Sequence, residues 1–562
     1  MTHQDTTVLI VGAGPVGLTA SILLSHAGVD NLVVDRREGP HRAPQAHVVN
    51  PRTLEIFRQV GLDWDELRAR ATRREDGSWV RWMTRLDGEE LGALSYERQG
   101  DENLAFTPTP LLNLSQHVLE PILLDHAEAA RPTAVRYRHQ WESLEQDERG
   151  ITARIRDLSS GDRYTVRSRY VLAADGASSR VRRSLGVEML GPDRLQSFMM
   201  IHFEANLRAL VAERPAILYW LLDPDAPGAL VAHDIEKTWV LMHAFDPASE
   251  LESDYTPERC EQLVRAAIGH GDVEILVRDT SVWTMTAQIA ERYRAGRVFL
   301  VGDSAHRFPP TGGMGMNTGI QDAHNLAWKI AAVETGWASP ALLETYELER
   351  RPVAQCNTDQ SLANALKMFE VFAALGLSED LDASRRNFRS ALATSAARAG
   401  VATAIANQQE HFDMFGLHLG FRYEAGALVA DGRESPHREN PVRDFVACLR
   451  SGARLPHAWV TKSGRRVSIL DLVAGGELTL ITGADGEAWA QAVVAAASRH
   501  VRTLIEGRDF SDREGHWEAV REIGRGGAIL VRPDQHVAWY ACAPASDAAT
   551  RLSAAVAAVV CH

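Results

Sequence analysis

Apolar runs of four residues alternate with amphipathic segments at the start of the chain. Residues 8–11 (VLIV) show no polar alternation, which is typical of a strand buried on both faces of a parallel sheet. Residues 15–28 place leucine and isoleucine at helical spacing and end on glycine. Residues 31–34 form a second buried run that ends at Asp35. This order predicts a βαβ unit.

The same strand pattern returns twice further along the chain. Residues 170–173 form a buried run closed by an Asp-Gly pair, and residues 298–301 form another that ends in a Gly-Asp pair. A loop rich in proline and glycine follows, and then a helix is expected over about 315–330. Between the two strands, the runs SFMMIHFEANL, AILYWLL, GALVAHD and TWVLMHAF predict an antiparallel sheet.

The last third of the chain has a different pattern. Residues 361–439 begin with an alanine-rich helical stretch, which predicts a helical connector. From about residue 440, apolar strands and helices alternate, which predicts a small α/β domain over 440–562. This region has no CxxC pair, so packing or contacts within a homo-oligomer are expected of it rather than redox activity.

Composition and charge narrow the classes of partner. The 562 residues carry a net charge of −14, which argues against nucleic acid or an anionic membrane as the main partner. Five scattered cysteines form no zinc or dithiol pattern, so no metal is expected, and they fit a reducing cytosol. No apolar run reaches the ~18 residues of a membrane span, and the N-terminus lacks a signal peptide pattern. A cytoplasmic protein is expected.

The sequence GAGPVG (residues 12–17) stands between the first strand and the first helix. In a dinucleotide-binding turn, the glycine at Gly12 makes the turn, Gly14 lets a pyrophosphate approach, and Gly17 allows close packing of helix and strand. Pro15 opens the helix, and Asp35 lies 23 residues after Gly12, near the spacing of an acid that binds ribose. The motif predicts a Rossmann-like unit. It does not distinguish NAD from FAD, and a glycine-rich turn without a ligand is the alternative.

Three motifs in order resemble the class A flavoprotein monooxygenases, the FAD-dependent aromatic hydroxylases. These are the glycine motif, the DG pair within ADGASS, and the segment GDSAHRFPPTGGMGMNTG. The resemblance covers residues 5–360 and continues more weakly to the end. It implies a discontinuous FAD-binding domain (1–180 and 280–360) and a substrate-binding sheet over 181–279. It also implies that the C-terminal domain is thioredoxin-like.

The resemblance implies roles for particular residues. Asp303 would bind the ribityl chain, and Gln116 would contact the flavin ribose region. Asp175 and Gly176 are associated with both FAD and the nicotinamide cofactor, and the helix near Gly315 would direct its positive end at the flavin pyrimidine. The cofactor-binding residues expected are Gly12, Gly14, Pro15, Gly17, Asp35, Arg36, Arg52, Gln116, Asp175, Gly176, Gly302, Asp303, Pro310, Gly313, Gly315, Met316 and Asn317.

Arginines near the N-terminus differ in how well they fit the family. Arg52 matches it, whereas Gln45 replaces an arginine that usually helps to hold the pyrophosphate or the mobile flavin. Arg42 is a candidate substitute. Arg36 and Arg37 either bind the 2′-phosphate of NADPH or lie in a solvated turn.

The activity implied by the resemblance is hydroxylation of a phenolic ring. NADPH or NADH would dock transiently, because no second glycine motif follows a strand, and reduced flavin would add O2 at C4a to give the hydroperoxide. Glycines at 312–319 would leave the backbone room for flavin movement. The carbonyl of Pro310 would face the substrate hydroxyl, the alternative being a rigid loop start.

A group that deprotonates the phenol would favour the reaction, because phenolate is the better nucleophile. The candidate catalytic residues are His202 and Tyr219, together with Pro310. The predicted sheet also contains Trp220, His233 and His243 as further candidates. The sequence does not choose among them, and a packing role is the alternative for each.

The substrate branch stays open between phenol or chlorophenol hydroxylases and aromatic polyketide hydroxylases. Two hypotheses outside the hydroxylases are a halogenase, whose WxWxIP-like signature is missing from the sequence, and a flavin-binding scaffold without catalysis. Regiochemistry and the preference between NADH and NADPH are not determined by the sequence.

Overall fold

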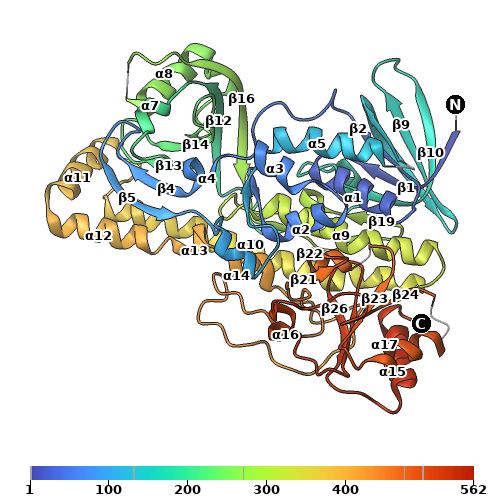
Figure 1. The fold of residues 1–562 in the computed structure, drawn as a ribbon. Helices are drawn as coiled ribbons and strands as arrows, with labels where there is room; N and C mark the ends of the chain where they lie inside the picture. Colours follow the sequence, from blue (N-terminus) through green and yellow to red (C-terminus); the bar gives the residue numbers. More distant parts are fainter. Residues whose placement is uncertain (1–2, 131–132, 270, 474, 496–498) are drawn as a thin grey trace.

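The structure is a computed structural model, and it describes residues 3–130, 133–269, 271–473, 475–495 and 499–562. Figure 1 shows three bodies: a unit built on the N-terminal strands, a second sheet with helices beside it, and a C-terminal unit that packs beneath both. No helix in the described ranges combines the length and apolar character needed to cross a membrane.

The first body is built on a mainly parallel sheet whose strand order is β18-β19-β10-β1-β2-β7. The predicted βαβ unit is confirmed, since β1 pairs in parallel with both β2 and β10 around helix α1. Strands β8 and β9 extend the edge of β10. The bounds are β1 (His3–Val11), α1 (Pro15–His26), β2 (Asn31–Asp35), β7 (Thr133–Tyr137), β8 (His139–Asp147), β9 (Gly150–Asp157), β10 (Arg163–Ala173), β18 (Arg294–Ala295) and β19 (Val298–Leu300).

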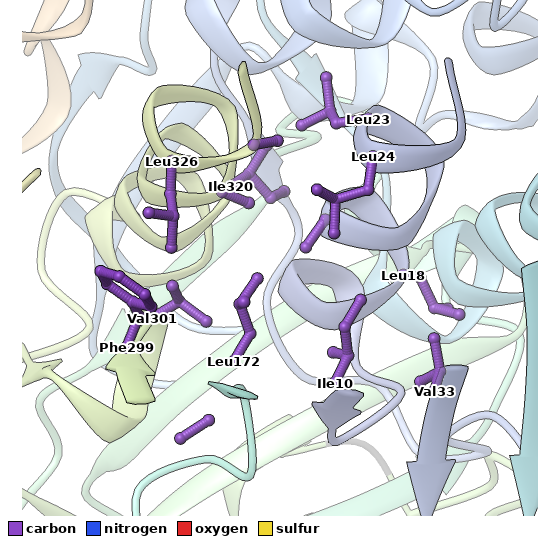
Figure 2. Packing of buried hydrophobic residues seen from close by; sticks show 14 of the residues in the cluster. Ile10, Leu18, Leu23, Leu24, Val33, Leu172, Phe299, Val301, Ile320 and Leu326 are labelled. Atoms are coloured by element: carbon purple, nitrogen blue, oxygen red, sulfur yellow. The ribbon is translucent and has the colours of Figure 1, made fainter. Parts of the chain in front are cut away.

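Helices cover this sheet and close its core. Figure 2 shows strand residues Ile10 and Leu172 between side chains of α1 and side chains of α9, such as Ile320. Burial of such aliphatic side chains stabilises the fold by about 1.5–3 kcal/mol each. The helices and short strands here are α2 (Pro51–Gln59), α3 (Trp64–Arg70), α5 (Gln116–Ala129), α6 (Arg180–Ser184), α9 (Met314–Glu334), β3 (Val48–Val49), β6 (Leu112–Asn113), β11 (Met189–Leu190), β17 (Gln288–Ala290) and β20 (His306–Arg307).

The second body is a seven-stranded sheet in the order β16-β12-β15-β14-β13-β4-β5. The predicted antiparallel sheet is confirmed for the strands between the DG and GD pairs. The sheet also recruits residues 79–95, which the expected range 181–279 omits, and β4 joins it through a parallel pairing with β13. The bounds are β4 (Trp79–Met83), β5 (Glu90–Ser95), β12 (Gln196–Glu204), β13 (Leu218–Leu221), β14 (Gly228–Asp234), β15 (Thr238–Phe245) and β16 (Leu276–Met285).

The two faces of this sheet have different partners. One face packs on helix α8 (Pro257–Ile268) and forms a closed apolar core with it. On the other face, the β13-β4-β5 end is covered by a helical layer, shown in orange in Figure 1. The helices of this region are α10 (Thr345–Ala374), α11 (Leu381–Ala393), α12 (Ser395–Ala406), α13 (Gln409–Phe412) and α14 (Phe415–Gly420), and α10 begins before residue 361, the start expected for the connector.

The C-terminal unit holds a four-stranded sheet in the order β24-β23-β25-β26. Strands β23 and β24 are parallel, whereas β25 is antiparallel to both of its neighbours. Side chains of α9 enter the core of this unit, so it is joined to the first body by packing. The bounds are β21 (Trp459–Lys462), β22 (Arg465–Ser468), β23 (Leu478–Thr482), α15 (Glu487–Ala495), β24 (Val501–Ile505), α16 (His516–Val520), β25 (Ala528–Val531), β26 (Val537–Ala541) and α17 (Ala548–Val559).

Candidate functional site

The glycine turn after β1 is tightly constrained on one side and open on the other. Gly12 has φ +111°, and a Cβ there would lie 2.2 Å from the carbonyl oxygen of Ala174. A Cβ on Gly17 would lie 1.9 Å from the carbonyl oxygen of Gly12, whereas one on Gly14 would meet nothing within 4 Å. Gly14 also caps α1 without any side-chain hydrogen bond, and Pro15 follows it. The first N–H groups of α1 are therefore available to an anion.

Asp35 at the end of β2 is held by the protein. Its carboxylate accepts the N–H of Ala13 at 2.7 Å and that of Arg37 at 2.8 Å, and it pairs with the Arg37 guanidinium at 3.1 Å. Burial opposes ionisation, but these partners lower the pKa of Asp35 below its usual value. Arg37 is thus engaged, and Arg36 is left exposed beside it. Arg36 remains a predicted cofactor contact.

The carboxylate of Asp175 caps the N-terminus of helix α6. It accepts the hydroxyl of Ser179 at 2.5 Å and the N–H groups of Arg180 at 2.7 Å and Val181 at 3.1 Å. Burial raises its pKa against these hydrogen bonds. Gly176 adopts φ +78° with open space where a Cβ would stand. In the DG pair, the carboxylate of Asp175 is therefore occupied by the protein, whereas the backbone at Gly176 faces open space.

Asp303 lies in a concave position. Its residue surface is exposed, yet desolvation by the surrounding protein raises its pKa, with His306 and Arg307 opposing that rise. Gly302 before it has φ +62° and approaches Val16 of α1, where a Cβ would lie 3.0 Å from a methyl group. Within the described chain, the carboxylate makes no hydrogen bond, so its oxygens are free for the hydroxyls of a ligand.

Arginines that the sequence reasoning missed stand beside Asp303. Arg182 is 4% exposed and donates to the carbonyl of Ser304 at 3.3 Å, while its Nε has no partner in the described part of the chain. The Nε of Arg307 is likewise buried and unpartnered there. Burial lowers the pKa of both guanidinium groups. Arg307 lies within the motif GDSAHRFPP, so this motif could have identified it as a site residue from the sequence.

The N-terminus of α9 is also free of a side-chain cap. Gly313 adopts φ +62° against Val48, and a Cβ there would lie 2.6 Å from that side chain. Asn317 accepts the N–H of Asn50 at 3.0 Å and donates to the carbonyls of Val48 at 2.9 Å and Gly313 at 2.7 Å. Its amide therefore fixes the loop before α2 over the helix end, and the backbone N–H groups of α9 face the ligand side. Gly315 faces open space, and Met316 is half-buried.

Two further predicted residues have local partners. The carbonyl of Pro310 accepts the N–H of Gly313 at 3.1 Å, and Pro310 itself is exposed. This turn bond leaves one lone pair of the carbonyl for a substrate hydroxyl, so the predicted role stays open. Gln116 is the first residue of α5. Its backbone N–H donates to the carbonyl of Ala46 at 2.7 Å, and its side-chain amide donates to Glu120 at 2.7 Å.

The side chain of Arg52 is engaged by partners within the protein. Its side chain is 1% exposed and is directed into the C-terminal unit, where it donates to Gln535 at 2.6 Å and to the carbonyl of Asp534 at 2.7 Å. It also pairs with Glu55 at 3.0 Å. Arg52 joins α2 to the C-terminal unit. The role of Arg52 in binding the cofactor stays a prediction.

The alternation of side chains along a strand places Tyr219 on the α8 side of the second sheet. Tyr219 of β13 belongs to the core on the α8 face, is 1% exposed and donates its hydroxyl to the carbonyl of Arg214 at 3.0 Å. His243 of β15 lies on that face too, against the ring of Tyr255. His202 of β12 alternates with the α8-face residues and is half-buried on the opposite face. That face is directed toward the first body, because the ring of His233 on β14 meets the ring of His47 there.

Replacing Tyr219 by phenylalanine is expected to leave turnover close to that of the wild type. The change removes one buried hydrogen bond to a carbonyl, which costs about 1 kcal/mol of folding free energy. Denaturant unfolding and steady-state turnover of the purified variant measure both quantities. A large fall in turnover at unchanged stability would support the catalytic role of Tyr219.

The arrangement fits a flavin dinucleotide. Two uncapped helix N-termini, the unpartnered Arg182 Nε and the free Asp303 carboxylate offer partners for phosphates and hydroxyls, and Gly14 leaves room for backbone contact. Among the residues the structure describes, no group of three or more His, Cys, Asp and Glu side chains is placed to hold a metal ion.

Comparisons with known proteins agree with this geometry. Residues 5–361 match the family model of the FAD binding domain, and residues 449–561 match that of the aromatic-ring hydroxylase C-terminal domain. The chain is 36% identical to the 2,4-dichlorophenol 6-monooxygenase of Delftia acidovorans, over 96% of this chain and 95% of that one. It is 34% identical to a putative polyketide hydroxylase of Streptomyces halstedii, over 97% and 94%. The crystal structure of the flavin-dependent monooxygenase PieE in complex with FAD and substrate superposes with a TM-score of 0.93, at 36% identity and 99% coverage of both chains.

Proposed function

The chain belongs to the family of FAD-binding aromatic-ring hydroxylases and is a flavoprotein monooxygenase, and from this premise we propose that it uses NAD(P)H and O2 to hydroxylate a phenolic or other electron-rich aromatic compound. One continuous set of contacts carries the proposal. Val48 touches Gly313 at the free end of α9, and the ring of His47 meets the ring of His233 on the second sheet. A single bound aromatic ring could therefore contact both the N-terminus of α9 and the second sheet.

The residues of the first body would hold FAD in two places. The α1 N-terminus with Gly14 would bind the pyrophosphate, and Asp303 would bind ribityl hydroxyls. The α9 N-terminus would stabilise negative charge on the reduced ring, by about 0.3–2 kcal/mol on general grounds. When bound, FAD supplies the electron transfer from NAD(P)H and the activation of O2.

The second sheet would hold the substrate ring on its flavin-facing side. That side presents half-buried apolar side chains of β12 and β15, including Phe198, Met200 and Met242. Apolar walls exclude water and orient the ring by contact, while a few polar groups fix its hydroxyl. A chlorophenol-like single ring is the first candidate. A multi-ring polyketide is the second, because the chain is similarly close to a relative with that printed name.

The test is substrate-stimulated oxidation of NADH and NADPH by the purified, FAD-loaded protein. A panel of chlorophenols, alkylphenols and polycyclic phenols would be supplied, and products would be analysed by mass for the gain of one oxygen atom. A product labelled from 18O2 supports the proposal. Bound FAD with no oxygenated product from any ring would leave the flavin-binding scaffold as the better explanation.

We also infer the division of the chain into parts. The FAD-binding part would comprise residues 1–180 and 280–360, with residues 79–95 given to the substrate sheet of 181–279 because they pair with it. Residues 361–439 would form the connector. The thioredoxin-like character of 440–562 is supported by the strand order β24-β23-β25-β26 with one parallel pair, and homo-oligomer contacts by this unit remain a prediction.

A further inference from the structure

Four histidines from four separate elements gather between the two bodies. His47 precedes β3, His117 lies in the first turn of α5, His202 is on β12 and His233 is on β14. The ring of His233 is perpendicular to that of His47 at 5.4 Å between centroids, and it faces His117 at 6.4 Å. His202 is close enough to lower the pKa of both His117 and His233. We name these four residues the histidine cluster.

The histidine cluster begins at the cofactor site. His47 is adjacent to Val48, whose side chain contacts Gly313 at the N-terminus of α9. His117 is adjacent to Gln116, the predicted flavin contact. His233 alternates with the α8-face core residues of β14, so it projects toward the flavin-binding body as His202 does. A substrate ring between flavin and sheet would therefore lie against the cluster.

His233 has an unexplained polar atom. The residue is 8% exposed, and its Nδ1 is buried without a hydrogen-bond partner in the described chain. An unsatisfied buried nitrogen costs about 1–3 kcal/mol, so such atoms are retained where a ligand or water supplies the partner. Burial, together with His47, His117 and His202, holds the pKa of His233 well below its usual value. The ring is therefore uncharged before substrate binds, and its unpartnered Nδ1 can accept the hydrogen bond of a substrate hydroxyl.

The other members of the histidine cluster have definite partners. The hydroxyl of Tyr96 lies 3.4 Å from Nε2 of His47, and burial lowers the pKa of His47 to about 4. The hydroxyl of Ser115 lies 2.7 Å from Nδ1 of His117, which is half-buried and so contacts solvent.

Among the residues that the structure describes, charged side chains shift the pKa of His202 but not that of the other three histidines. Burial lowers the pKa of His202, while the carboxylates of Asp279 and Glu204 raise it and the guanidinium of Arg278 lowers it. His202 therefore has charged neighbours of both signs, whereas the shifts of His47, His117 and His233 come from burial and from other histidines.

We propose that His233 is the catalytic base that takes the hydroxyl proton of the bound phenol, and that His117 relays the proton to solvent. The inference rests on the proposed hydroxylase function. The substrate O–H bond breaks and an N–H bond forms at Nδ1 of His233 while the ring is being hydroxylated, so the proton is transferred in the transition state rather than beforehand. The proton then leaves through the half-exposed His117 to water. His47 and His202 are positioning residues that hold the His233 ring and keep it neutral before the transfer.

His233→Gln tests the base, because glutamine keeps a polar side chain that does not titrate. The matched control is His243→Gln, a histidine on the opposite face of the same sheet. With an ordinary phenol at pH 7, turnover of His233→Gln is expected to fall by about 10²–10⁴-fold, the typical contribution of general base catalysis. With a nitrophenol that is already ionised, turnover is expected to stay close to that of the wild type. His117→Gln is expected to shift the pH profile of turnover while KM stays constant.

Separate outcomes distinguish this inference from the proposed function. If the wild type hydroxylates neither phenol, both fail. If the wild type hydroxylates both and His233→Gln behaves as His243→Gln does, or loses both substrates equally, only the assignment of the base is overturned. Visible spectra of bound FAD establish that each variant is folded and loaded.

Discussion

Replacing Gly17 by alanine is expected to prevent the first body from folding, whereas replacing Gly14 by alanine is expected to leave a folded protein that does not retain FAD. The added Cβ at Gly17 would lie 1.9 Å from the carbonyl oxygen of Gly12, and backbone must move to relieve that contact. Overpacking costs about 1–3 kcal/mol and occasionally more, and a contact this short with backbone atoms belongs at the upper end. At Gly14 the backbone angles, φ −78° and ψ −177°, suit alanine, and the Cβ would occupy open space intended for a ligand.

The measurements are thermal unfolding of the apoproteins and titration with FAD by flavin fluorescence. Gly400→Ala is the matched control, since Gly400 is an exposed residue of α12 with nothing near its missing Cβ. That variant is expected to gain up to about 1 kcal/mol, because alanine favours a helix over glycine, and to bind FAD normally. Retention of FAD by a folded Gly14→Ala protein would exclude a phosphate at this turn.

The sequence predicted the elements whose signal is local. The run at 8–11, the glycine turn and the second run at 31–34 specify the βαβ unit, because buried parallel strands and glycine turns leave a mark within a few residues. The pairing of β4 with β13 left no such mark. It joins residues 79–83 to residues 218–221, and only the complete sheet shows that these edges meet.

Site residues divide in the same way. Asp303 and Asn317 belong to a motif that is read along the chain, and both stand at the cofactor end. Tyr219 was chosen by residue type, but one step of strand alternation separates it from the flavin-facing side. Arg52 also fitted by motif, yet two of its partners, Gln535 and Asp534, are 483 and 482 residues away in sequence. Tertiary partners of this kind cannot be derived from one sequence.

Replacing Glu349 of α10 by glutamine is expected to produce the largest loss of stability among changes far from the cofactor. Its carboxylate accepts from Lys329 of α9 at 2.7 Å and from both terminal nitrogens of Arg532 in the C-terminal unit at 2.8 Å, and all three side chains are fully buried. Removing the negative charge leaves two buried cations, of which only Arg532 keeps a second carboxylate, that of Asp534. Breaking a buried pair by removing one partner costs about 3–5 kcal/mol.

Denaturant unfolding measures this loss, and limited proteolysis shows whether the C-terminal unit separates first. Glu514→Gln is the control, because its pair with Arg466 is solvent-exposed and such pairs contribute about 0–1 kcal/mol.

The pH dependence of stability follows from the lowered pKa of the Glu349 carboxyl group. Burial opposes ionisation of Glu349, but Arg532 and Lys329 outweigh it and lower its pKa from 4.5 to about 2. The charged group therefore stabilises the wild type fully above pH 4.5, and the contribution is lost as pH falls toward 2. The stability difference between wild type and Glu349→Gln should shrink across that interval, and a difference that stayed constant there would show that the charge of Glu349 is not what joins the two units.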